Sequence, residues 1–135
     1  MKMLTNTKRY ELPAIRLLLI LNTAVLLFHI CIVAKIIPYD IAWGGRLKSD
    51  PEMYVFEAIS ILINLLFSFI LLLRGRLIEP ILSGKVVHVM LWIFFVIYVI
   101  NTIGNLFAVT AFEKYFAILT FMFAVLIGFI LFRKK

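Results

Sequence analysis

Two side chains with acid–base chemistry, His29 and Glu57, lie within long apolar stretches of this sequence. A carboxylate near the edge of the hydrocarbon needs a cation, a proton or water, and Glu57 therefore requires an explanation. A histidine and a carboxylate together can hold or transfer a proton. They stand on separate apolar stretches, however, and the sequence does not say whether they meet. The early position of Glu57 in its stretch also fits the headgroup level, where it would need no such partner.

Other polar side chains recur at helical spacing within the same apolar stretches. Asn22 and His29 are one heptad apart, and steps of three and four residues link the polar positions around Glu57 and those after Tyr98. Such side chains should face the interior of a helix bundle, where they form either a binding site or hydrogen bonds that merely hold the helices together. The candidate polar core comprises Asn22, His29, Glu57, Ser60, Asn64, Tyr98, Asn101 and Asn105.

The segment 36–52 separates the first two apolar stretches and carries charge, aromatic rings and glycine. Pro38 ends an apolar stretch, and Gly44-Gly45 permits a turn. The segment is either an interfacial loop with solvated charges or a lid over a polar pocket. In the second interpretation Asp40, Trp43 and Arg46 face inward and join the candidate site. Ser49 and Glu52, with Pro51 between them, are spaced as the start of the next helix.

Hydrophobic residues make up 64% of the 135 residues, which excludes an ordinary soluble domain. The apolar stretches are each about twenty residues long, the length that crosses a hydrocarbon layer of about 30 Å. The sequence therefore predicts one all-α domain over 1–135, an integral membrane four-helix bundle. The expected helices cover about 14–37, 51–73, 85–107 and 115–132.

The net charge of +7 would indicate nucleic-acid binding in a soluble protein. Here ten of the 14 Lys and Arg flank the apolar stretches at the two termini and in the 74–85 connection, and four lie in the other two loops. By the positive-inside rule both termini are cytoplasmic and the first loop is extracytoplasmic. We expect a multi-pass protein of the cell (inner) membrane, N-in and C-in, that binds no nucleic acid.

The last apolar stretch carries small residues on one face. Because small side chains let helices approach closely, this face should pack against protein and not lipid. Large rings at Phe116, Phe121, Phe123 and Phe129 should then mostly cover the lipid-facing surface. The packing residues are Ala117, Thr120, Ala124 and Gly128.

The sequence contains no metal-binding spacing, phosphate-binding loop or nucleophile elbow, and Cys31 is its one cysteine. We expect no cofactor and no metal, and the sequence favours a non-enzymatic role. The leading interpretation is a binding or interaction module that uses the extracytoplasmic half of the polar core and the 36–52 loop. One alternative is an oligomeric proton- or cation-coupled small transporter in which Glu57 titrates. Another is a lipid-modifying membrane enzyme with His29 and Glu57 as acid and base. The expected partners are the lipid bilayer and either further copies of the chain or a larger membrane complex.

Overall fold

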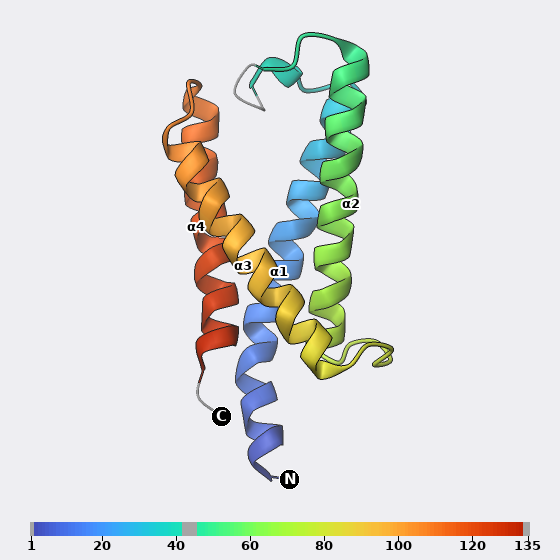
Figure 1. Cartoon of the computed structure of the whole chain (residues 1–135), viewed down its shortest axis with the longest axis vertical. Coiled ribbons are helices and arrows are strands. Elements are labelled where there is room, and N and C mark those ends of the chain that lie inside the picture. Colours follow the sequence, from blue (N-terminus) through green and yellow to red (C-terminus); the bar gives the residue numbers. More distant parts are fainter. Residues whose placement is uncertain (1, 42–45, 134–135) are drawn as a thin grey trace.

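The computed structural model describes residues 2–41 and 46–133, with side chains from residue 9 onward in the first range. Four long α-helices form the fold (Figure 1). Each of them contains a segment long and apolar enough to cross a membrane. The all-α fold with four candidate spans, predicted from the sequence, is thereby confirmed. The elements are α1 (Lys2–Val33), the short 3₁₀ helix η1 (Tyr39–Ile41), α2 (Asp50–Arg74), α3 (Gly84–Leu106) and α4 (Ala111–Phe132).

The bundle has two different ends (Figure 1). The N- and C-terminal ends of the chain and the connection between α2 and α3 lie at one end, which we call the terminal end. The connection that contains η1 and the turn between α3 and α4 lie at the other end, which we call the loop end. Both ends of the chain therefore lie on the same side of the bundle.

Helix α1 is longer at its start and shorter at its end than the expected 14–37. It continues through Pro13 to Lys2, because a missing proline N–H can be compensated within a membrane helix. It ends at Val33 because Lys35 adopts a left-handed conformation with φ 60°. There the Ile36 N–H donates to the carbonyl oxygen of Cys31 at 2.9 Å, which closes the last turn as a Schellman motif.

Helix α2 ends in the same way, with Arg76 at φ 52° and the Leu77 N–H donating to the carbonyl oxygen of Leu72 at 2.9 Å. A basic residue thus occupies the left-handed position that glycine usually takes. The preceding Gly75 is right-handed and serves packing instead. A Cβ atom on Gly75 would lie 3.3 Å from Cγ2 of Ile15, so the glycine allows α1 to approach closely.

Side-chain caps fix where the later helices begin. Ser49 caps α2, accepting from the Glu52 N–H, as the spacing of these residues predicts. Helix α4 begins at Ala111, before the expected start near 115, because Thr110 caps it. The Thr110 hydroxyl accepts from the Glu113 N–H at 3.3 Å and donates to the Glu113 carboxylate at 2.9 Å. Glu113 and Lys114, which were expected in the turn before the last helix, therefore belong to the first turn of α4.

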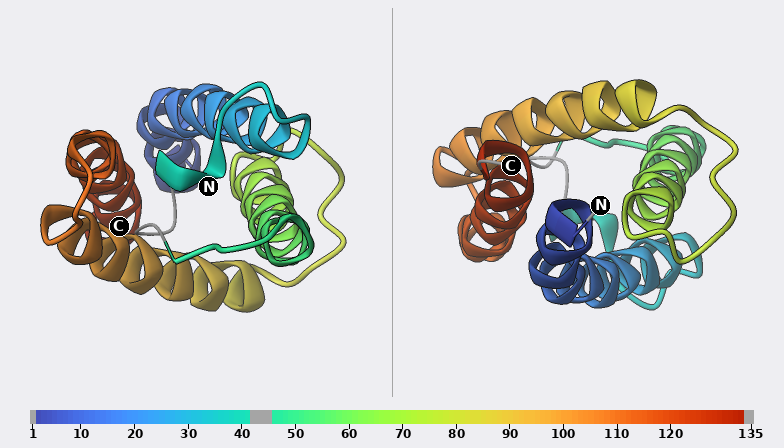
Figure 2. Two further views of the ribbon diagram at one scale, coloured as in Figure 1. Left: turned by 90° about the horizontal axis from the view of Figure 1, so that it is seen from above. Right: turned by 90° about the horizontal axis from the view of Figure 1, so that it is seen from below.

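The four helices form two antiparallel hairpins, because α1 packs mainly along α2 and α3 mainly along α4 (Figure 2). Three phenylalanines join the two hairpins in the core, and Phe67 of α2 lies between the others. Its ring centroid is 4.7 Å from that of Phe94 and 6.1 Å from that of Phe123. From this aromatic centre the apolar core continues toward the terminal end, and buried Glu57, Ser60 and Asn64 lie toward the loop end.

Candidate functional site

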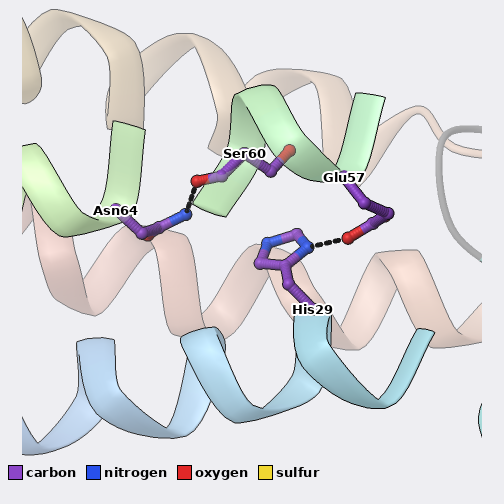
Figure 3. Close-up of polar contacts among 4 residues, drawn as sticks. All are labelled: His29, Glu57, Ser60 and Asn64. Atoms are coloured by element: carbon purple, nitrogen blue, oxygen red, sulfur yellow. Dashed lines mark hydrogen bonds and ion pairs between the residues drawn. The ribbon is translucent and has the colours of Figure 1, made fainter. Parts of the chain in front are cut away.

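The two acid–base side chains meet between α1 and α2. Nδ1 of His29 lies 2.6 Å from Oε2 of Glu57 (Figure 3). The Glu57 side chain is 0% exposed and that of His29 is 14% exposed. Nδ1 donates when the carboxylate is ionised, and the carboxyl group donates when it carries the proton. Glu57 therefore lies inside the bundle in contact with His29.

An amide cluster continues from this pair toward the middle of the bundle. Nδ2 of Asn22 donates to the carbonyl oxygen of Asn64 at 2.8 Å and to the Ser68 hydroxyl at 2.7 Å. Nδ2 of Asn64 donates to the carbonyl oxygen of Ser60 at 2.7 Å. The second ring nitrogen of His29 lies on the side of Ser60 and Asn64 (Figure 3). We call this set the polar seam: Asn22, His29, Glu57, Ser60, Asn64 and Ser68.

The polar seam runs through about half of the bundle. From Glu57 to Ser68 it extends about 16 Å along α2, against a hydrocarbon layer of about 30 Å. Its amides and its acid–base pair bond mainly to each other and to the helix backbone. Within the described residues, Oδ1 of Asn22 is buried without a hydrogen-bond partner. The polar seam thus mostly satisfies its own hydrogen-bonding groups.

Apolar side chains close the polar seam at the loop end. Ile32 and Met53 are fully buried and pack with Leu47, which is 6% exposed. Outside them, Nζ of Lys35 lies 2.5 Å from Oδ2 of Asp50 and links the end of α1 to the start of α2. The hydrogen bond and the charge of Asp50 raise the pKa of Lys35 above its ordinary value. Glu57 is therefore separated from the loop-end surface by packed side chains.

At the terminal end the same two helices are joined by an ion pair between Glu11 and Arg74. Nε and Nη2 of Arg74 each donate to a different carboxylate oxygen, both at 3.1 Å. Glu11 is 5% exposed, so this fork-shaped contact is largely desolvated. From the sequence, Arg74 is expected only as a charge of the second loop. The feature that could have indicated the ion pair is that Glu11 and Arg74 stand at the neighbouring ends of two apolar stretches.

On α3 the three candidate polar residues have different surroundings. Tyr98 is buried and stacks on Phe123, with ring centroids 4.6 Å apart and an 8° angle between the planes. Asn101 is exposed and Asn105 is half-buried, and the structure does not bring either amide into the polar seam. The hydroxyl of Thr102, a residue that was not among the candidates from the sequence, lies 3.1 Å from the hydroxyl of Thr120 and so links α3 to α4.

The exposure of Asn101 marks the level at which the two hairpins stop packing against each other on the α2–α3 side. Phe94 lies one heptad earlier on the same face of α3 and is 2% exposed. On α2 the same change occurs between Ile70, which is 1% exposed, and Ile63, one heptad nearer the loop end, which is 42% exposed. Figure 1 shows the hairpins diverging toward the loop end. We call the region of Ile63, Asn101 and Asn105 the uncovered face.

In the described part of the first loop, the side chain that faces inward is not one of those expected for a lid. Asp40 in η1 and Arg46 are both exposed, and Trp43 lies outside the described residues. Leu47 is the side chain of segment 46–48 that is buried against the α1–α2 hairpin. On the α4 side, η1 contacts the turn at Thr110, whose hydroxyl oxygen lies 3.4 Å from the carbonyl oxygen of Ile41. The described part of this loop is therefore held by the buried Leu47, and not by inward-facing charges of Asp40 or Arg46.

The small-residue face of α4 is buried against the chain itself. Ala117 is 3% exposed, and Thr120 and Ala124 are each 6% exposed. Gly128 is buried, and a Cβ there would lie 3.2 Å from Cε2 of Phe95 on α3. Phe121 and Phe129 are exposed, whereas Phe123 is fully buried, and its expected place on the lipid-facing surface was wrong. The reason is the stacking of Phe123 on Tyr98.

The polar seam can be compared with the metal-binding and cavity features of the part of the chain that the structure describes. Within residues 2–41 and 46–133, no cluster of three or more His, Cys, Asp or Glu could hold a metal ion. A shallow hollow of about 220 Å³ on α3 is lined by Lys85, Val86, Val89 and Met90. It lies near the terminal end of α3, far along the helix from Asn101, and contains none of the candidate site residues.

The chain matches no protein-family model, no curated protein and no solved structure. Fold and composition alone define the class. Four helices that are each long and apolar enough to cross a membrane suggest a small multi-pass membrane protein.

Proposed function

We propose that this protein is a non-enzymatic membrane module that binds a ligand or partner at the uncovered face. The observation that carries this proposal is the exposed amide of Asn101 on a helix long and apolar enough to span a membrane. An amide at that depth is costly in lipid without a hydrogen-bonding partner. The amides of the polar seam bond to groups of the chain itself, whereas Asn101 is available to another molecule.

A photoreactive amino acid placed at Asn101 tests this binding in native membranes. Irradiation should give one dominant adduct at this position, because a bound molecule presents the same atoms in every copy. The same probe at the neighbouring Ile100, which is 61% exposed and points to another side of α3, is the matched control and should give only a spread of bulk-lipid adducts. Identical adduct patterns at the two positions would contradict the proposal.

We further propose that both termini are cytoplasmic and that the uncovered face lies in the extracytoplasmic half. The support is the distribution of Lys and Arg, which favours the terminal end as the cytoplasmic side. In a Cys31→Ala background, Ser49→Cys should react with a membrane-impermeant thiol reagent in intact cells. Thr5→Cys and Lys135→Cys should react only after the cells are opened. The opposite labelling pattern would reverse the orientation.

A second candidate function is proton- or cation-coupled transport by an oligomer, favoured by the buried contact between Glu57 and His29. When the neutral pair gives up one proton it keeps a net charge of −1, which a bound substrate cation can balance. Glu57→Gln should then abolish proton-coupled movement of substrate in vesicles while the protein still folds. Equal coupled movement by the variant and the wild type would exclude this role for Glu57. An acid–base reaction on a lipid would require the lipid to reach a fully buried carboxylate, and we do not propose it.

A further inference from the structure

The uncovered face opens sideways, between α2 and α3. On the opposite side of the bundle, α1 and α4 stay in contact at the loop end through Phe28. Its ring centroid lies 5.4 Å from that of Phe112 and 5.3 Å from that of Phe116. On the α2–α3 side, contact through Phe67 and Phe94 gives way within one heptad to exposed side chains. Ile63 and Asn101 are therefore open to the surroundings of the bundle on the α2–α3 side.

The chemistry of the uncovered face is amphiphilic. Ile63 presents an apolar wall on α2, and Asn101 and Asn105 present amides on α3. With a rise of about 1.5 Å per residue, Asn101 lies about 7.5 Å from the end of α3 at Leu106. The helix is about 34 Å long and the hydrocarbon about 30 Å thick, which puts Asn101 about 5 Å inside the hydrocarbon boundary and Asn105 close to it. This is within reach of the ester groups that join acyl chains to glycerol.

We propose that the uncovered face binds one glycerolipid of the bilayer, which deepens the proposed function and rests on it. An acyl chain lies along Ile63, and an ester carbonyl oxygen accepts a hydrogen bond from Nδ2 of Asn101. Asn105, nearer the boundary, meets the glycerol or headgroup. The lipid satisfies the amide and covers the apolar wall at once.

The shape of the opening favours an acyl chain over a helix from a second copy. Packed helices are separated by about 8–10 Å between axes, so a helix lying between α2 and α3 would need them far apart along its whole length. Yet these two helices touch at Phe67 and Phe94, with ring centroids 4.7 Å apart. One heptad, about 10 Å along the axis, separates this contact from Asn101. A narrow, flexible chain can taper into that space, and a rigid helix cannot.

Lipid retention by the full-length protein tests the inference. The protein is reconstituted into vesicles of phosphatidylethanolamine and phosphatidylglycerol, extracted with a mild detergent, and analysed by native mass spectrometry. Wild-type protein should retain one phospholipid per chain. Asn101→Leu should lower the retained fraction about fivefold, since a net hydrogen bond is worth about 1 kcal/mol. Asn101→Gln should keep retention near wild type, and Ile100→Leu is the matched control and should not change it.

A second variant tests the apolar wall. Ile63→Trp fills the space on α2 without touching either amide and should also lower retention. Equal retention by wild type, Asn101→Leu and Ile63→Trp would overturn the lipid assignment. Dimers that depend on Asn101 and carry no lipid would also overturn it, while leaving the proposed binding role of the face intact. If no bound species of any kind depends on Asn101, the proposed function fails as well.

Discussion

The two hairpins are held together by different kinds of contact. Between α1 and α2 the contacts include a bidentate ion pair at Glu11, the amide of Asn22 and the buried pair of His29 and Glu57. Between α3 and α4 they are the stacked rings of Tyr98 and Phe123, small residues, and one hydroxyl pair. Polar contacts in a membrane require a specific register, because a shifted helix leaves each group without its partner. Aromatic and small-residue contacts depend instead on fit.

This difference has a consequence for the site. In the first hairpin, polar groups are used to join two helices of the same chain, so few of them are left for another molecule. In the second hairpin, the core side of α3 is apolar, and Asn101 stands apart from the internal contacts. The hairpin with fewer polar residues therefore supplies the amides that face outward at the loop end. Variants that weaken one kind of contact should affect one hairpin more than the other.

The largest effect is expected for Glu57→Ala. Removing one partner from this buried acid–base pair leaves Nδ1 of His29 without its hydrogen-bond partner, and the free energy of unfolding should fall by about 3 kcal/mol. Unfolding in detergent, followed by tryptophan fluorescence, measures the change. Val55→Ala on the same helix is the matched control, since Val55 is 59% exposed, and should change stability by less than about 0.5 kcal/mol. Equal, small effects of the two variants would mean that the polar seam does not hold the first hairpin.

In the second hairpin, Ala124→Leu should lower the free energy of unfolding by about 1–3 kcal/mol through overpacking. Ala124 is 6% exposed and belongs to the core cluster that contains Tyr98 and Phe123. The neighbouring Val125 is 51% exposed, so Val125→Leu adds bulk without entering the interface. The measurement is the same unfolding experiment. Equal stability of the two variants would contradict the role of close fit between α3 and α4.

The four spans could be predicted because hydrophobicity and length are local properties of the sequence. The common face of Glu57, Ser60 and Asn64 also follows from helical spacing alone. What lies opposite a face is a property of packing, which one sequence does not contain. For that reason the approach of His29 to Glu57 was not predicted, and Phe123 was assigned to lipid. Helical spacing therefore predicts which residues share a face, but it does not predict which helix packs against that face.

Two other features were not predicted, one for a local reason and one for a tertiary reason. Lys35 ends α1 in a left-handed conformation, which is uncommon for a residue with a Cβ atom and has no clear signal in an apolar stretch. Asn101 shares its face with the buried Phe94, and periodicity therefore places both in the core. Its exposure arises from the divergence of the hairpins toward the loop end (Figure 1). Divergence is a tertiary effect, and the sequence pattern does not encode it in an obvious way.

The smallest effect is expected for the ion pair between Lys35 and Asp50, which links the end of α1 to the start of α2. Asp50 raises the pKa of Lys35 above the ordinary 10.5. A group whose folded pKa is raised stabilises the fold fully below its unfolded pKa, and this stabilisation is lost as pH rises through the folded value. The contribution should therefore be constant at neutral pH and disappear in strongly alkaline solution. Because both side chains are exposed, salt should also weaken it.

The test compares wild type with Lys35→Met as a function of pH. Methionine keeps a Cβ atom at the left-handed position, so the backbone strain is similar in both proteins and only the charge differs. The difference in free energy of unfolding should shrink as the pH rises above 10.5, the ordinary pKa of lysine, and with added salt at neutral pH. Lys48→Met removes an exposed charge from the same loop that has no ion pair among those observed in the described residues, and it should show little such dependence. A difference between wild type and Lys35→Met that persists unchanged at high pH would show that the contact joins the helices by packing and not by charge.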